Sequence, residues 1–448
     1  MRVVAMTEGT TGSPYTPHTA ATAEAMRLAL GVEHDHELFD IPDDLHFPGD
    51  LGIEARSERA VRNELQAMLG ENEEMTEFLG RGHYEHYVPS LVDHLADRSE
   101  FLTSYTQYQP EIAQGFLQAL FEYQSLVAAL TGLSVANCSM YDGATALGET
   151  ARLASRIVRS RDRILVPELL RDGKRAVLEN YLAGTEMSIE TYPMVDGNVD
   201  IEALATRVDH DVALVYVETP TVRGTLEEHV EEVTALSHES GALVCLGSDI
   251  VALSVIEEPA AVGVDIVVGE ADSLGVSTSY GLGLGLFACR GSFLRQVPGR
   301  LVGTSTDASG RRAFTLTLQT REQHIRRERA TSNICTNQAW VALRTAMHAA
   351  WLGPDGLVDL ANRCVTDASE LADRLDTIDG IQAPLHDRSH FREFVVRSRR
   401  PAAAVVDELA TRRIAVHEID EHLIQICTTE TTAGARDDLV TAVEEVMA

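Results

Sequence analysis

Three glycines at alternate positions have the residue type of a loop that binds phosphate. They are Gly281, Gly283 and Gly285 in the stretch SYGLGLGLFACR. A dinucleotide-binding loop lies between a strand and a helix, whereas these glycines run into the strand-like segment LGLFACR. The pattern therefore favours a turn with close backbone contacts over an NAD site. The chain also lacks the GxSxG and HExxH motifs, which excludes the commonest serine-hydrolase and zinc-protease sites.

Basic side chains offer further candidates. His83 and His86 in GRGHYEHYVP have a spacing that can bind a metal, but no third ligand accompanies them, so we expect no metal site. The single lysine, Lys174, stands among arginines in RDGKRA, which favours a solvated residue at the start of a helix. A further cluster contains five arginines and one histidine. We expect it to form ion pairs at a subunit interface rather than to bind an anion. Its members are Arg312, Arg321, His324, Arg326, Arg327 and Arg329.

The charge balance is unusual. The 69 acidic residues exceed the 37 basic ones and give a net charge of −32, and 36 of the basic residues are arginine. Such a surface is typical of molar salt, where the Debye length falls to about 3 Å and carboxylate repulsion is screened. The acids are spread along the chain rather than massed in a tail, and they would repel nucleic acid. We expect the protein of an extreme halophile, with no nucleic-acid partner.

Membrane and secretion signals are missing from the sequence pattern. No run of about 18 apolar residues occurs, and the first residues lack the apolar stretch of a signal peptide. The six cysteines are scattered without CxxC spacing, which fits reduced, buried thiols. We therefore expect a cytoplasmic protein with no membrane partner.

The elements that must position any site follow from hydrophobic periodicity. We expect a disordered extension over 1–14, a helical N-terminal arm over 15–100, and a large α/β domain over 101–336. Strand-like runs recur there every 20–30 residues, which predicts a mostly parallel sheet with helices on both faces. Residues 337–448 predict a long helix ending at Gly353, then a smaller α/β domain. The strand-like runs are Ile164–Val166, Met187–Tyr192, Val212–Val217, Leu243–Leu246, Ile266–Val268 and Leu284–Ala288.

Several long segments together closely resemble the P-protein family of the glycine cleavage system, glycine dehydrogenase (decarboxylating), and within it the N-terminal-half subunit, subunit 1. The resemblance covers nearly the whole chain from Tyr15. The segments are GRGHYEHYVP, SEFLTSYTQYQPEIAQG, LTGLSVANCSMYDGATALGE, and PGRLVGTSTDASGRRAFTLTLQTREQHIRRERATSNICTNQ with the WLGPDGL stretch after it.

The resemblance implies a fold, a reaction and partners. The fold is that of fold-type-I pyridoxal-phosphate enzymes. The reaction is decarboxylation of glycine with transfer of the aminomethyl group to the lipoyl group of H-protein. The assembly is an α2β2 complex in which subunit 2 carries the Schiff-base lysine and binds pyridoxal 5'-phosphate, while subunit 1 holds no cofactor covalently.

Particular residues match the pocket of cofactor-dependent members. The resemblance places Asp249 where an aspartate faces the pyridinium nitrogen, and Ser273 where the lysine would stand. Other matching residues lie at a turn into a helix, where a cofactor phosphate would bind. In this subunit they imply a relic pocket. They are Asn137, Ser139, Asp142, Gly143 and Thr145.

Two departures fall in the same pocket. Glu218, Pro220 and Thr221 replace the usual glutamine-x-proline-asparagine pattern, and the turn after Tyr280 lacks the expected proline and histidine. Both weaken any expectation that this chain binds the cofactor itself. They leave the other matching segments untouched.

The YTQYQPE loop supplies the candidate residues for a contribution to the partner. By resemblance, Tyr105, Tyr108, Gln109 and Glu111 lie near the subunit interface that completes the partner's active site. Packing at that interface alone is an equal alternative. Three functions stay open: a subunit needed for catalysis, a scaffold that stabilises subunit 2 and docks H-protein, and an independent pyridoxal enzyme that uses Lys174.

Overall fold

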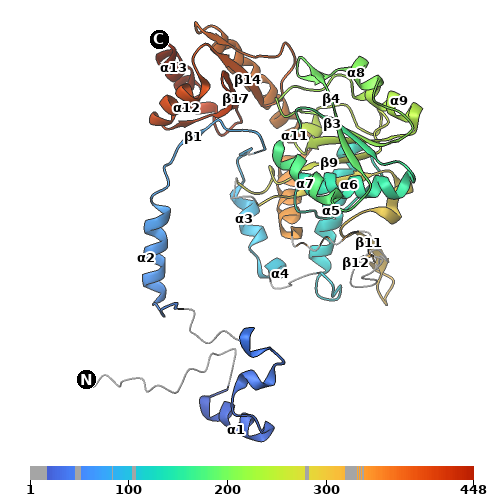
Figure 1. The fold of residues 1–448 in the computed structure, drawn as a ribbon, viewed down its shortest axis with the longest axis vertical. Helices are drawn as coiled ribbons and strands as arrows, with labels where there is room; N and C mark the ends of the chain where they lie inside the picture. The colour runs from blue at the N-terminus through green and yellow to red at the C-terminus, as the bar shows by residue number, and fades with distance from the viewer. Residues whose placement is uncertain are drawn as a thin grey trace. The chain divides into compact units, whose positions relative to one another are not determined.

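The computed structural model describes residues 18–45, 52–82, 84–102, 107–277, 282–317 and 338–448, together with 330, 332, 334 and 336. The predicted extension 1–14 lies outside the described residues. The chain divides into two compact units, Met1–Glu73 and Glu74–Ala448, and Figure 1 gives the labels of their elements. In the described part, no helix is long and apolar enough to cross a membrane.

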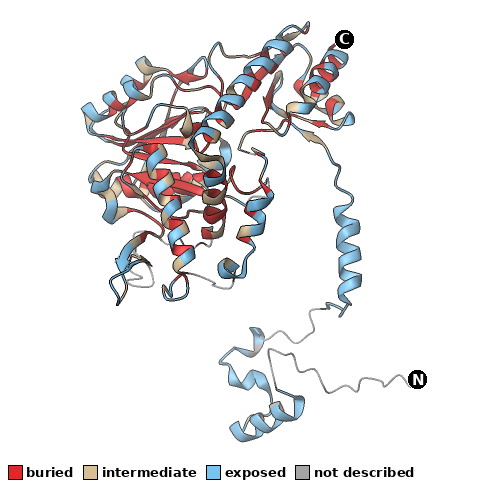
Figure 2. Ribbon diagram, turned by 180° about the vertical axis from the view of Figure 1, so that it is seen from behind, coloured by how far each residue is buried: buried red, intermediate tan, exposed pale blue. Residues whose placement is uncertain are grey.

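The first unit contains helices α1 (Ala20–Leu30) and α2 (Glu58–Leu69) and the short 3-10 helices η1 (Asp35–Leu38) and η2 (Asp43–Leu45). Side-chain oxygens of Thr19 and Ser57 cap the two α-helices by accepting from backbone N–H groups. Neither helix buries a residue, and α2 is blue along its length in Figure 2.

A seven-stranded sheet with the order β2-β10-β9-β8-β7-β3-β4 organises the second unit. Strands β4, β3, β7, β8 and β9 are parallel, whereas β10 runs antiparallel to both β9 and β2. Each of the six predicted strand-like runs forms a strand here. The bounds are β2 (Val135–Ala136), β3 (Arg163–Pro167), β4 (Ser188–Tyr192), β7 (Val212–Glu218), β8 (Leu243–Asp249), β9 (Ile266–Glu270) and β10 (Gly285–Cys289).

Helices cover both faces of this sheet because successive side chains of each strand point to opposite sides. In β7, Leu214 and Tyr216 join the core beneath α6 (Gly143–Ile157) and α7 (Asp172–Leu182). Val215 and Val217 join the other core, beneath α5 (Gln114–Thr131), α9 (Val230–Ser240) and α11 (Ala339–Asp376). Figure 2 shows the buried sheet between exposed helix faces. The predicted α/β class is confirmed.

A smaller four-stranded sheet, β13-β14-β17-β16, follows α11 and packs against α12 and α13. The predicted end of the long helix at Gly353 is an interruption, because Gly353 has φ 68° and ψ 177° and a second helical part begins at Pro354. The bounds are β13 (Ile381–Gln382), β14 (Glu393–Ser398), α12 (Ala402–Thr411), β15 (Ile414–Ala415), β16 (His417–Asp420), β17 (Leu423–Cys427), η6 (Ala433–Ala435) and α13 (Arg436–Met447).

Short elements complete the second unit. Strand β1 pairs with β15, and β5 with β6, while β11 and β12 form a hairpin. The bounds are β1 (Thr76–Glu77), α3 (Ser90–Ala96), α4 (Ser99–Leu102), β5 (Met194–Val195), β6 (Asn198–Val199), α8 (Ile201–Ala205), η3 (Ala252–Ser254), η4 (Gly291–Gln296), β11 (Val302–Thr306) and β12 (Arg312–Leu316).

Candidate functional site

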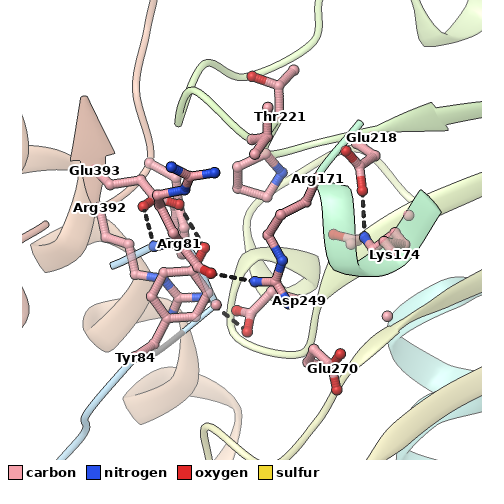
Figure 3. A pocket seen from close by; sticks show the side chains of 17 residues that line it. Arg81, Tyr84, Arg171, Lys174, Glu218, Thr221, Asp249, Glu270, Arg392 and Glu393 are labelled. Carbon is pink, nitrogen blue, oxygen red and sulfur yellow. Dashed lines mark hydrogen bonds and ion pairs between the residues drawn. The ribbon is translucent and has the colours of Figure 1, made fainter. Parts of the chain in front are cut away.

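A cavity of about 80 Å³ lies at the carboxyl ends of β7, β8 and β9. Parallel strands bring their carboxyl ends to one edge, where α/β folds bind ligands. We call it the strand-end cavity, and Figure 3 shows its side chains converging from both sheets. Its lining residues are Arg81, Gly82, Tyr84, Arg171, Lys174, Glu218, Pro220, Thr221, Val222, Gly247, Ser248, Asp249, Gly269, Glu270, Phe391, Arg392 and Glu393.

Asp249, at the end of β8, has both carboxylate oxygens occupied. Its Oδ1 accepts backbone N–H groups of Val251 at 3.0 Å and Ala252 at 3.2 Å. Its Oδ2 accepts from Ser273 Oγ at 3.1 Å and pairs with Arg392 Nη2 at 2.8 Å. The structure therefore brings the two predicted residues Asp249 and Ser273 together, with an arginine that the sequence analysis did not single out.

Arg392 is almost fully buried and belongs to a chain of hydrogen bonds. Its Nη1 donates to His86 Nε2 at 2.9 Å, and His86 Nδ1 contacts Glu430 Oε2 at 2.8 Å. The guanidinium carbon lies 3.5 Å from the centroid of the Tyr84 ring. Burial opposes the charged form, yet Asp249 and its neighbours raise the pKa of Arg392. Both ring nitrogens of His86 are thus occupied, and its predicted companion His83 lies outside the described residues.

Lys174 is not solvated, so that interpretation was wrong. Its side chain is only 17% exposed and lies on α7 beside the strand-end cavity. Nζ donates to Glu218 Oε1 and, at 3.1 Å, to the Tyr216 hydroxyl. Figure 3 shows the ammonium turned toward Glu218. The physical reason is the turn of the helix, which directs this side chain at the buried end of β7 rather than at water.

A second cavity of about 300 Å³, the helix-end cavity, adjoins the start of α6. Two of the N–H groups that begin this helix are already bonded to carboxylates. Asp142 Oδ1 accepts from Thr145 N at 2.6 Å, and Glu270 Oε1 accepts from Gly143 N at 2.8 Å. The predicted residues Asp142, Gly143 and Thr145 therefore meet at the helix start. Glu270, which was not predicted, joins them there.

Two carboxyl groups near the helix start have perturbed pKa values. Burial and the charge of Asp272 raise the pKa of Glu270 to about 8, although the N–H of Gly143 acts in the opposite direction. Burial, and then the charge of Asp249, raises the pKa of Asp272 to about 6. Burial also raises the pKa of Glu149, which lies on α6. Negative charge is therefore already costly at this place.

Asn137 and Ser139 do not join either cavity. Asn137 Nδ2 donates to the carbonyl oxygen of Pro298 at 3.0 Å, and both side chains are buried. Asn137 Oδ1 and Ser139 Oγ have no hydrogen-bond partner among the described residues. The structure thus separates them from Asp142, Gly143 and Thr145.

The described part of the YTQYQPE loop exposes its predicted residues. Tyr108 is 53% exposed; its hydroxyl accepts from Arg300 Nη2 at 3.0 Å. Gln109 and Glu111 are exposed, and Ile112 beside them is 69% exposed. Tyr105, Gly281 and most of the predicted arginine cluster lie outside the described residues; the exception is Arg312.

The sequence analysis did not single out Arg392, Glu270, Arg81 or Tyr84. One signal was available for Arg392, because an arginine between the two phenylalanines of FREF at the start of a strand must be paired when buried. Glu270 offered a similar signal at the end of an apolar strand. Nothing in the local pattern connects Arg392 with Asp249, which lies 143 positions earlier, since 392 − 249 = 143.

Comparison with known proteins adds independent findings. A family model described as glycine cleavage system P-protein matches residues 13–443. A Halobacterium salinarum protein described as probable glycine dehydrogenase (decarboxylating) subunit 1 is 58% identical over 438 residues, covering 97% of this chain and 99% of the relative. A crystal structure of glycine decarboxylase (P-protein) of the glycine cleavage system, in inhibitor-bound form, matches with a TM-score of 0.87 and 38% identity over 97% of this chain and 100% of that one.

A more distant match concerns the fold alone. The sphingosine-1-phosphate lyase of Burkholderia pseudomallei gives a TM-score of 0.65 at 13% identity and covers 90% of this chain and 93% of that one. Together these matches confirm the predicted fold-type-I architecture.

Proposed function

The chain belongs to the P-protein family of the glycine cleavage system, and we propose that it is the subunit of a two-subunit glycine decarboxylase that does not hold the cofactor. Subunit 2 would carry the lysine and pyridoxal 5'-phosphate in an α2β2 complex. The complex would decarboxylate glycine and transfer the aminomethyl group to lipoylated H-protein. The burial of the five described cysteines and the lack of CxxC spacing in the sequence support a cytoplasmic site of action.

The observation that carries this proposal is the ion pair between Asp249 and Arg392. An aspartate that strengthens the cofactor's electron sink must face the ring nitrogen. Here the guanidinium of Arg392 lies 2.8 Å from Oδ2, and Ser273 donates to the same oxygen. A pyridinium ring would have to displace a buried arginine, and Ser273 offers no amine for a covalent bond to the cofactor.

The phosphate end of the relic pocket fits the cofactor no better. A phosphate binds a helix N-terminus through free N–H groups. At α6 the N–H of Gly143 is bonded to Glu270 and that of Thr145 to Asp142. At the helix start a phosphate would meet the carboxylates of Asp142 and Glu270. The residues present therefore do not fit pyridoxal phosphate, and no step of the reaction is assigned to them.

Reconstitution tests the proposal. The full chain, subunit 2 and their mixture would be assayed for glycine-dependent exchange of CO2. We expect activity in the mixture only, and the same activity when the chain carries Lys174→Ala, provided that the variant remains folded. Activity of the chain alone that disappears in Lys174→Ala would overturn the proposal in favour of an independent enzyme.

The exposed loop supports a direct contribution to the partner's active site. Tyr108, Gln109 and Glu111 present polar groups beside the exposed apolar side chain of Ile112, a composition suited to an interface. If these groups assist catalysis, Tyr108→Phe or Glu111→Gln should lower turnover in an α2β2 complex of unchanged stability. Loss of assembly with unchanged turnover per complex would instead support the scaffold function.

A further inference from the structure

The charged groups that line the strand-end cavity are mostly neutralised in pairs. Lys174 pairs with Glu218, and Arg392 pairs with Asp249. The Glu393 carboxylate accepts three hydrogen bonds from within the protein. The donors are the Arg81 backbone N–H at 2.7 Å, the Tyr84 hydroxyl at 2.5 Å and Gln425 Nε2 at 2.7 Å. Glu270 accepts from the start of α6. Each acid in the lining thus already has an internal partner.

Two guanidinium groups in the lining have no acidic partner among the described residues. Among the described residues, no carboxylate lies within ion-pair distance of the side chain of Arg81 or Arg171. Arg171 Nη1 donates to the backbone carbonyl of Arg81, which leaves the rest of its fork available. The guanidinium of Arg81 has no hydrogen bond or ion pair with another described residue. Both side chains are half-buried. This is unexpected in a chain in which 69 acids compete for 37 bases.

The formal charges of the lining balance when Glu270 is ionised, and their sum becomes positive when Glu270 is protonated. The lining contains four bases, Arg81, Arg171, Lys174 and Arg392, against the four acids Glu218, Asp249, Glu270 and Glu393. Because burial and Asp272 raise the pKa of Glu270 to about 8, that carboxyl group is mostly protonated at neutral pH. Nearby, burial and the charge of Arg81 lower the pKa of Arg223. Unpaired positive charge therefore accumulates on one side of the cavity.

We propose that the strand-end cavity binds a small organic anion, with its carboxylate or phosphate group held by the guanidinium groups of Arg81 and Arg171. Guanidinium forks bind both groups through paired, charge-assisted hydrogen bonds. The aromatic side chains of Tyr84 and Phe391 supply an apolar wall in the same lining. Figure 3 shows Arg171 reaching between the two groups of paired charges.

This inference rests on the proposed function in one respect, because a cofactor held here would fill the same cavity. The two can fail separately. Binding is measured on the full chain without subunit 2, whereas the proposed function is tested by activity of the pair. A negative binding result would not contradict the proposed function, and an inactive pair of subunits would not contradict the binding site.

Titration calorimetry of the full chain tests the site with inorganic phosphate, succinate and glycine as probes, at fixed ionic strength. Binding of phosphate alone would identify a phosphate ester as the ligand class, and binding of succinate alone a carboxylate. In Arg81→Gln and in Arg171→Gln the affinity should fall at least about tenfold, because each removes a charge-assisted contact. The control Arg399→Gln removes an exposed arginine paired with Asp379 and should leave affinity unchanged.

Thermal unfolding of each variant checks that the fold is retained. Arg171→Lys keeps the charge but loses the fork and should give an intermediate affinity. The proposal is overturned if none of the three probes binds. It is equally overturned if a probe binds with the same affinity in both Gln variants as in the parent chain.

Discussion

Arg392 and Asp249 form an almost fully buried ion pair in the lining of the strand-end cavity. Their side chains are 2% and 8% exposed, and each has further hydrogen bonds to buried groups. Breaking such a pair leaves one charge without compensation, which costs far more than the pair itself contributes. The role of Arg392 at this position is therefore structural as well as electrostatic.

The first prediction follows from that pair. Arg392→Met should lower the free energy of unfolding by about 3–5 kcal/mol, because Asp249 is left buried and unpaired. Urea denaturation measures the change. The control Arg399→Met, at an exposed pair with Asp379, should cost about 0–1 kcal/mol. Equal costs for both variants would contradict the electrostatic account of Arg392.

The second prediction concerns pH. The folded pKa of Glu270 is about 8, above its ordinary value of 4.5, so the native state binds more protons than the unfolded state between these values. The stability contribution is present below the unfolded pKa and is lost as pH rises through about 8. Glu270→Gln keeps an acceptor for Gly143 and should remove this loss. Free energies of unfolding measured between these two pKa values test it, with exposed Glu111→Gln as the control that should keep the parent slope.

Residue chemistry could be predicted only where it depends on local order along the chain. Asp249 and Ser273 were singled out by the family resemblance, which places them after successive strands, and the structure brings them into contact. The ion pairs of Arg392 and Lys174 were not predicted, because their partners lie far away in the sequence or are reached only through the turn of a helix. Asn137 was grouped with the helix start by proximity in sequence, yet its side chain bonds to Pro298.

At the scale of elements, the turn after β7 holds the two sheets of the second unit together. The N–H of Gly224 donates to the carbonyl oxygen of Thr221, and its own carbonyl oxygen accepts from Phe391 N at 3.0 Å. Gly224 has φ +85°, and an added Cβ would overlap the backbone carbonyl of Glu393. Only glycine satisfies both constraints.

The third prediction tests this turn. Gly224→Ala should destabilise the second unit by more than about 1–3 kcal/mol, the usual cost of left-handed strain alone, because a backbone clash is added to it. The matched control is Gly184→Ala, where φ is +77° but no heavy atom lies within 4 Å of the added Cβ. Calorimetric unfolding compares the two, and a cost for Gly224→Ala no larger than the control would refute the clash.

Strands were predicted well where the sequence contains a short, continuous apolar run. Strands β3, β7 and β8 are apolar over most of their length because both faces are buried, and they were found near their expected bounds. Gly353 misled the prediction of the long helix, because a glycine followed by proline fits both a helix end and a kink between two helices. Nothing in the sequence decides between these, since the choice depends on what the next helical part packs against.

At the scale of the whole molecule, the net charge of −32 sets the salt response. The fourth prediction is that the melting temperature rises between about 0.1 M and 1 M potassium chloride, where the Debye length falls from about 10 Å to 3 Å. Screening of the many surface carboxylates relieves repulsion in the folded state. A melting temperature that is unchanged or falls over this range would contradict the halophilic interpretation, which stays a prediction.

The central claim is that the cofactor is bound by the partner, and covalent trapping tests it most directly. The chain and subunit 2 would be mixed with pyridoxal phosphate, reduced with borohydride, and digested for mass spectrometry of the labelled peptide. We predict a label on a lysine of subunit 2 and none on this chain. A label on Lys174, the chain's single lysine and a neighbour of the strand-end cavity, would contradict the account.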